Sequence, residues 1–192
     1  MKVGLYFGSF NPIHIGHMMI ANHMVEFTDL DQLWLVVSPQ NPLKKRPSLL
    51  KAHHRLEMVC RAVEDFPKMR ASDIEFKLSR PSYTIDTLVV LEEKFPSYKF
   101  CLIMGGDAFA SLSQWKNYEH ILAHYPIYVY PRLGKRSEIP MSFQGDICRI
   151  EISVIELSAS FIRKAINEGK NVRPLLPQKV WEYLDHNLFY RK

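Results

Sequence analysis

The chain has 192 residues, a net charge of +5 and three cysteines. This length suffices for one well-buried core and is marginal for two. No apolar run approaches the ~20 residues of a membrane span, and the N-terminus lacks the pattern of a signal peptide. Three cysteines with no CxxC pair favour a reducing cytoplasm and give no zinc site. The modest charge suits small phosphate-bearing ligands, whereas a nucleic-acid surface normally carries a denser basic stripe.

Short apolar runs alternate with amphipathic segments along the whole chain. Strands alternating with helices of this length favour right-handed βαβ units and a mostly parallel sheet, in one α/β domain spanning residues 1–192. The sequence leaves open whether the domain forms a homo-oligomer. The predicted strands are 2–7, 33–37, 71–76, 99–104, 127–130 and 149–156, and the predicted helices are 16–27, 52–65, 84–95, 160–168 and 177–187.

The segment GSFNPIHIGH (8–17) follows the first predicted strand. In a parallel sheet, ligands bind beyond the carboxyl ends of the strands, where loops meet helix N-termini. The spacing fits neither the G-x-G-x-x-G dinucleotide fingerprint nor a P-loop. A glycine at this junction, Gly8, would let the backbone of Ser9 and Phe10 approach a ligand.

His14 and His17 are three residues apart, so both would point to the same side of a helical first turn. A helix N-terminus favours anions, and imidazoles add donors that are neutral or cationic near neutral pH. An H-x-x-H pair by itself is more often structural, and no third ligand follows at a familiar metal spacing. The position after the first strand therefore favours a phosphate cradle.

The segment ELSASFIRK (156–164) follows the last predicted strand and opens a helix. Ser158 suits the N-cap position, which is an ordinary structural role. Ser158, Ser160 and the nearby N–H groups also make a second phosphate-binding helix start, with Arg163 in its first turns. Two such helix starts at one sheet edge would hold different parts of a triphosphate.

The segment IMGGDAFASLSQW (103–115) follows another buried strand. Gly105 and Gly106 would let a ligand lie against the backbone. Asp107 would accept hydrogen bonds from ribose or base, and Trp115 offers a flat face to an aromatic ring. The alternative is a helix cap at Asp107 and a core tryptophan.

The loop NPLKKRP (41–47) follows the second strand and lies at the same predicted edge as the histidines. Its basic side chains would close over phosphates, although basic runs in loops are usually only solvated. Lys44 and Lys45 are the candidates for this contact, and their register stays open.

GSFNPIHIGH and LSASFIRK together resemble the H-x-G-H and I-S-S-T-x-I-R signatures of the nucleotidyltransferase superfamily. Within it, SYTIDTL (82–88), IMGGDAFASLSQW and the tail LLPQKVWEYLDHNLFY (175–190) resemble bacterial nicotinate-nucleotide adenylyltransferases. The likeness covers essentially the whole chain. It implies a Rossmann-like, doubly wound fold of the nucleotidyltransferase type, whose C-terminal helices at about 158–190 complete the nucleotide site.

The resemblance implies transfer of AMP from ATP to nicotinate mononucleotide, which gives deamido-NAD and pyrophosphate, in a cytoplasmic enzyme. Mg²⁺ would be held mainly by ATP phosphates and water rather than by protein ligands. His14, His17 and Arg163 would act on the phosphates. The ATP contacts would come from Gly8, Ser9, Phe10, Lys44, Lys45, Gly105, Gly106, Asp107, Ser158 and Ser160, and the mononucleotide contacts from Thr84, Trp115 and Lys116.

Three features depart from the family pattern. Ala159 stands where a serine is usual and Ser160 where a threonine is usual, the basic loop lacks its common histidine, and residues 131–147 match nothing in it. Two alternatives stay open: adenylylation of nicotinamide mononucleotide or another acceptor such as phosphopantetheine, and a non-catalytic nucleotide-binding module.

Overall fold

A computed structural model of the protein describes residues 1–39, 49–79, 81–131, 145–153 and 155–191. Its centre is a six-stranded sheet in the order β3-β2-β1-β4-β5-β6, with every neighbouring pair parallel. The expected parallel α/β architecture is therefore confirmed. The strands are β1 (Lys2–Gly8), β2 (Gln32–Val37), β3 (Met69–Ser72), β4 (Lys99–Gly105), β5 (Ile127–Tyr130) and β6 (Ile147–Arg149).

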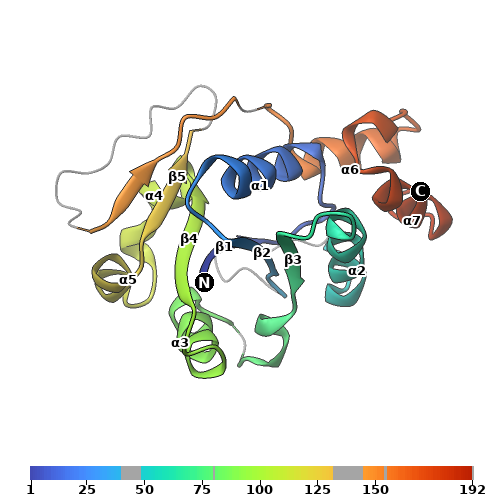
Figure 1. The fold of residues 1–192 in the computed structure, drawn as a ribbon. Coiled ribbons are helices and arrows are strands. Elements are labelled where there is room, and N and C mark those ends of the chain that lie inside the picture. Colours follow the sequence, from blue (N-terminus) through green and yellow to red (C-terminus); the bar gives the residue numbers. More distant parts are fainter. Residues whose placement is uncertain (40–48, 80, 132–144, 154, 192) are drawn as a thin grey trace.

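Helices cover both faces of the sheet (Figure 1). One apolar core lies between the sheet and α1, α2, α6 and α7, and the other lies between the sheet and α3, α4 and α5. Among the described residues, no helix has the length and apolarity needed to cross a membrane. The helices are α1 (Ile15–Phe27), α2 (Ala52–Val63), α3 (Thr84–Lys94), α4 (Gly106–Ala110), α5 (Tyr118–His124), α6 (Ala159–Asn167) and α7 (Gln178–His186), with 3-10 turns η1 (Ile74–Lys77), η2 (Leu112–Gln114) and η3 (Arg173–Leu175).

Two of the predicted strands are wrong in extent. Only the first two residues of the predicted strand 71–76 belong to β3, and residues 74–77 form η1, which buries Ile74 and Glu75 instead of pairing. The predicted strand 149–156 pairs only through β6, at residues 147–149. Ile150 donates to Val129 O at 2.9 Å, and the chain then leaves the sheet toward α6.

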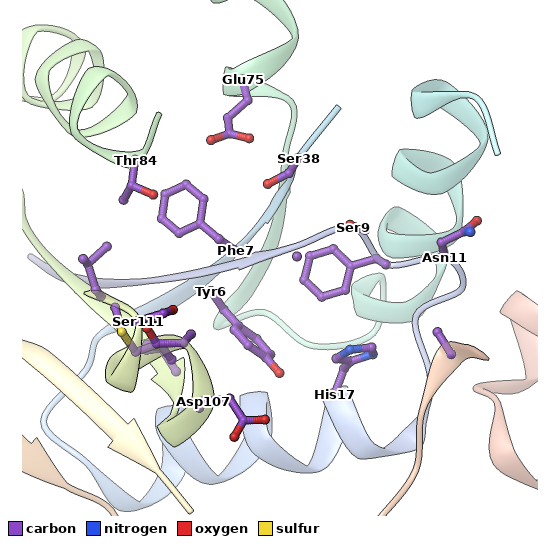
Figure 2. A pocket seen from close by; sticks show the side chains of 18 of the residues that line it. Tyr6, Phe7, Ser9, Asn11, His17, Ser38, Glu75, Thr84, Asp107 and Ser111 are labelled. Atoms are coloured by element: carbon purple, nitrogen blue, oxygen red, sulfur yellow. Dashed lines mark hydrogen bonds between the residues drawn. The ribbon is translucent and has the colours of Figure 1, made fainter. Parts of the chain in front are cut away.

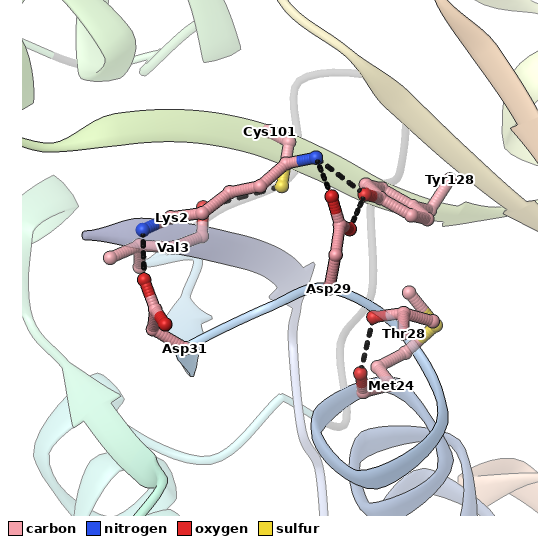
Figure 3. A network of polar contacts seen from close by, with 8 residues as sticks. All are labelled: Lys2, Val3, Met24, Thr28, Asp29, Asp31, Cys101 and Tyr128. Atoms are coloured by element: carbon pink, nitrogen blue, oxygen red, sulfur yellow. Dashed lines mark hydrogen bonds and ion pairs between the residues drawn. The ribbon is translucent and has the colours of Figure 1, made fainter.

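A polar network lies at the amino-terminal edge of the sheet (Figure 3). Lys2 Nζ lies 2.7 Å from Asp29 Oδ2 and 2.8 Å from the hydroxyl of Tyr128, which also donates to Asp29. Hydrogen bonds from Lys2 and Tyr128 lower the pKa of the Asp29 carboxyl. The network ties β1 and β5 to the turn after α1, at the edge opposite the carboxyl ends of the strands.

The strand order changes direction between β1 and β4. Tyr6 pairs with Ile103, and the chain runs outward from β1 through β2 and β3 on one side and from β4 through β5 and β6 on the other. Ligands in open parallel sheets bind at such a switch point. The fold thus directs attention to the carboxyl ends of β1 and β4.

Candidate active site

A cavity of about 830 Å³ lies at this switch point (Figure 2). Its walls come from the carboxyl ends of β1, β2, β4 and β5, from the segment before α3, and from the start of α6. It brings together most of the residues singled out in the sequence. Those among its lining are Gly8, Ser9, Phe10, His14, His17, Thr84, Gly105, Asp107, Trp115, Lys116, Ser158 and Ser160.

Gly8, the last residue of β1, lines the cavity and also makes room for a neighbouring side chain. A Cβ on Gly8 would lie 2.7 Å from the ring of Phe10, so the glycine makes room for that side chain. Phe10 has a positive φ of 44° and is buried. Its ring centroid lies 5.2 Å from that of His17, in an edge-on arrangement. The absence of a side chain at Gly8 therefore allows the Phe10 ring to pack against His17.

His14 and His17 lie together as the spacing predicts. Their rings stack with centroids 3.7 Å apart and planes 26° apart. His14 is the N-cap of α1, and its backbone N–H donates to His17 Nδ1 at 3.2 Å. Because Nδ1 accepts this hydrogen bond, neutral His17 carries its proton on Nε2. A Cβ on Gly16 would lie 3.2 Å from the His14 ring, so that position favours glycine.

The start of α6 faces the same cavity. Ser158 is its N-cap, as predicted, and its hydroxyl accepts from Phe161 N at 3.2 Å. An accepting hydroxyl still has a proton to donate to an anion. Arg163 donates to Asn11 O at 2.8 Å and to Ser160 Oγ at 3.3 Å. Its guanidinium therefore fastens α6 to the loop that carries the histidines, and Arg163 is not part of the cavity lining.

The opposite wall contains the residues expected to hold a mononucleotide. Thr84 is the first residue of α3. Trp115 follows η2, is partly buried, and packs against the core beneath α3, α4 and α5. Lys116 Nζ lies 2.9 and 3.1 Å from the two oxygens of Asp86 and 5.0 Å from the ring centroid of Tyr83.

The glycine pair ends β4 and opens α4. Gly105 is the last residue of the strand, and Gly106 and Asp107 begin the helix. Asp107 and Gly105 line the cavity, while Gly106 is buried behind them. Figure 2 shows Asp107 and His17 on the same side of the cavity.

A buried arginine connects two of the loops and was not expected from the sequence. Arg55 has no exposed surface and donates to the backbone oxygens of Ser9 at 2.6 Å, Ser38 at 2.7 Å, Pro39 at 2.8 Å and Leu50 at 3.0 Å. Desolvation lowers its pKa to about 10, so it stays protonated at neutral pH. The signal in the sequence was an arginine on the face of helix 52–63 that also carries buried Met58 and Val59.

The chain end reaches the same loop. The Tyr190 hydroxyl donates to Asn11 Oδ1 at 2.6 Å, and the backbone N–H of Leu50 donates to that oxygen at 3.3 Å. Burial raises the pKa of the Tyr190 hydroxyl, so it acts as a neutral donor. A contact across 179 positions has no local sequence signal.

Two sets of expectations receive no structural description. Lys44 and Lys45 lie outside the described residues, as does most of the segment 131–147. Among the residues that the structure describes, there is no group of three or more His, Cys, Asp or Glu side chains placed to hold a metal ion.

Comparison with known proteins identifies the family. A family model described as cytidylyltransferase-like matches residues 5–166. The probable nicotinate-nucleotide adenylyltransferase of Flavobacterium johnsoniae is 55% identical over 193 residues, covering 100% of both chains. The protein of that name from Bacteroides thetaiotaomicron is 42% identical, over 96% of this chain and 91% of its own length.

Solved structures agree on the fold. The Plasmodium falciparum nicotinic acid mononucleotide adenylyltransferase complexed with NaAD superposes with a TM-score of 0.82 at 20% identity, over 98% of this chain and 97% of that chain. Together with the sequence relatives, this confirms the Rossmann-like nucleotidyltransferase fold and the family expected from the motifs. The chain therefore belongs to the cytidylyltransferase-like family and, within it, to the nicotinate-nucleotide adenylyltransferases.

Proposed function

We propose that this chain transfers AMP from ATP to the 5′-phosphate of nicotinate mononucleotide, forming deamido-NAD and releasing pyrophosphate. The observation that carries the proposal is the stacked pair His14 and His17, which opens into the same cavity as the start of α6. Family membership at 55% identity over the full chain supports the same reaction.

The reaction needs little covalent work from the protein. An oxygen of the mononucleotide phosphate attacks the α-phosphorus of ATP, and the bond from that phosphorus to the α,β-bridging oxygen breaks. Pyrophosphate leaves with the electron pair. Both reactants are anions, so the barrier consists mainly of charge repulsion and alignment. Catalysis therefore depends on donors fixed around the α-phosphate and the departing pyrophosphate.

His17 is the donor whose orientation is best defined. Its Nδ1 accepts from the backbone N–H of His14 at 3.2 Å, so in neutral His17 the ring donor is Nε2–H, which would donate to a phosphate oxygen. A preorganised donor stabilises charge that develops in the transition state. His14 stacks on this ring and shares the helix N-terminus, where the dipole favours anions.

The β- and γ-phosphates would lie toward α6. Ser158 and Ser160 line the cavity at the N-terminus of this helix. Arg163 holds the helix against Asn11 and adds positive charge behind the phosphates. Lys44 and Lys45 stay candidates for the same task outside the described residues. We accordingly take residues 1–192 as one catalytic unit in which the segment 158–190 completes the nucleotide site.

Mg²⁺ would enter with ATP. The cavity offers hydroxyls, imidazoles and the single carboxylate of Asp107 near the histidines, a donor set that suits an ion held chiefly by phosphate oxygens and water. When bound, the ion neutralises phosphate charge.

The mononucleotide would occupy the opposite wall. Trp115 would stack on the pyridine ring, and the backbone near Thr84 and Lys116 would receive the nicotinate carboxylate. The N-terminus of α3 favours an anion there. Gly105, Gly106 and Asp107 would lie along the nucleotide.

Three free cysteines, at positions 60, 101 and 148, suit the reducing cytoplasm where we place the enzyme.

The test is a pyrophosphate-release assay with ATP and Mg²⁺. We expect faster release with nicotinate mononucleotide than with nicotinamide mononucleotide, and none with phosphopantetheine. A faster rate with the amide would move the chain to the alternative acceptor, and ATP binding without pyrophosphate release would favour a nucleotide-binding module.

A further inference from the structure

Glu75 is a buried carboxyl group at the mononucleotide end of the cavity. Its side chain is 3% exposed and yet belongs to the cavity lining. Figure 2 shows it beside Ser38 and Thr84, around Phe7 and away from His17 and Asp107. Oε1 accepts from the Thr87 hydroxyl at 3.1 Å, and the hydroxyls of Ser38 and Ser82 also interact with the carboxylate.

The surroundings of Glu75 disfavour its charged form. Desolvation raises its pKa, and the hydroxyls of Ser38, Thr87 and Ser82 oppose this only in part. No described cation lies close enough to offset the burial: Lys116, across the α3 terminus, is held by Asp86.

The other ionisable groups near Glu75 can be named for each neighbouring element. The end of β2 contributes the hydroxyl of Ser38, which does not titrate. Tyr83 lies at the N-cap of α3 and Asp86 in its first turn, while Asp73 precedes η1 and Lys77 ends it. Arg80 lies outside the described residues.

We propose that Glu75 is a specificity-determining residue whose charge state sets the choice between acid and amide mononucleotides. This rests on the proposed function, which puts the nicotinate carboxylate beside Thr84 and Trp115. Thr87, whose hydroxyl binds Glu75, lies one turn after Thr84 on α3. Two carboxylates in one desolvated pocket do not both ionise without a large cost. Binding the acid therefore requires Glu75 to hold a proton, taken from solvent when Glu75 is ionised beforehand.

A carboxamide has no second negative charge, so it binds to either form of Glu75. The affinity for nicotinate mononucleotide should fall by up to about tenfold per pH unit above the pKa of Glu75, while the affinity for nicotinamide mononucleotide should lack this fall. Both ligands carry the same ribose phosphate, so its titration cancels in the ratio of their dissociation constants.

The experiment measures both dissociation constants by calorimetry across weakly acidic to alkaline pH, with wild type, Glu75→Gln and Thr87→Val. In wild type the acid-to-amide Kd ratio should rise with pH. In Glu75→Gln it should be flat. Thr87→Val removes a hydroxyl that stabilises the carboxylate, so its rise should begin at higher pH, which a purely structural role would not produce.

A rise in the ratio that persists in Glu75→Gln would overturn the proposal, as would a flat ratio in wild type. If Glu75→Gln does not fold, the Thr87→Val variant decides. A rise in the Kd ratio that begins at higher pH than in wild type supports the proposal, and a rise at the same or lower pH overturns it. These outcomes are separable from failure of the proposed function, in which wild type would release no pyrophosphate with either mononucleotide.

Discussion

The orientation of His17 is set by one hydrogen bond at the start of α1. The His14 backbone N–H, which a helix start leaves without an intrahelical acceptor, donates to His17 Nδ1. The rings of Phe10 and Tyr6 pack edge-on against His17, with centroids 5.2 and 6.2 Å away. A donor fixed in this way would meet a phosphate oxygen without reorganising, and such preorganisation is the main source of a donor's catalytic value.

His17→Ala should lower kcat by about 10²–10³-fold, because one preorganised donor to developing charge contributes roughly 2.7–4 kcal/mol. Steady-state pyrophosphate release checks it. His23→Ala is the matched control, since His23 lies on the same helix and stacks only on Phe27 at 5.0 Å in the contacts described. Turnover of His17→Ala equal to that of the control would remove His17 from the phosphate site.

Trp115→Ala should weaken binding of nicotinate mononucleotide far more than binding of ATP, because the proposed site stacks the indole on the pyridine ring and not on the adenine. Separate calorimetric titrations give the two dissociation constants. Trp115→Phe keeps an aromatic face and should retain most of the affinity. Equal losses for both ligands in Trp115→Ala would make the ring a purely structural part of the core.

Among the structural elements, α2 has the least expected role. It buries Arg55 against the sheet, and this one side chain joins the loop after β1 to the loop after β2 and to the start of α2. Four backbone oxygens neutralise no charge, so the guanidinium stays a buried cation against the loop after β1, residues 9–14. The loops after β1 and β2 are thereby fixed relative to each other.

Arg55→Met should lower the free energy of unfolding by about 3 kcal/mol, since it leaves buried carbonyl groups without donors. It should also raise the KM for ATP more than the KM for the mononucleotide, because Arg55 holds Ser9, which we propose contacts ATP. Urea denaturation and initial rates measure the two effects. Arg55→Lys keeps the charge and part of the hydrogen bonding, so its stability and its KM for ATP should lie between those of wild type and Arg55→Met. A KM for ATP that stays at the wild-type value in Arg55→Met would show that Arg55 contributes only to folding.

Across the whole molecule, the last residues close onto the first loop. α7 packs on α2, and the chain then brings the Tyr190 hydroxyl to Asn11. Arg163 reaches the backbone oxygen of the same asparagine. The C-terminal segment therefore holds the loop after β1 in place through hydrogen bonds to Asn11.

Tyr190→Phe should cost about 1 kcal/mol of stability through loss of one hydrogen bond and should raise the KM for ATP. Tyr183→Phe is its control, because the Tyr183 hydroxyl bonds His54 Nδ1 at 2.8 Å and does not contact the loop. Thermal denaturation should show comparable losses of stability in the two variants. Initial rates at varied ATP concentration should show a changed KM for ATP in Tyr190→Phe alone. A KM change of the same size in both variants would contradict a specific role for Tyr190.

The sequence by itself determined the order of elements and most of their extents. The helices α2, α6 and α7 are clearly amphipathic, and the predicted starts at 52 and 84 match α2 and α3. The short helices α4 and α5, of five and seven residues, were not predicted because they span too few turns to show a clear period. The residues near 74 alternate like a strand but form η1, because burial of Ile74 and Glu75 there prevails over pairing.

The histidine pair, the serine cap of α6 and the glycine end of β4 could be predicted because each depends on residues that are close together in the sequence. What only the tertiary structure decided is how these pieces are held together. Arg55 and Tyr190 bond residues far along the chain, and Glu75 is buried where η1 meets α3, so it is the folded state that places all three. Local spacing cannot encode such contacts, because the partners meet only when the sheet and its two helical layers have formed.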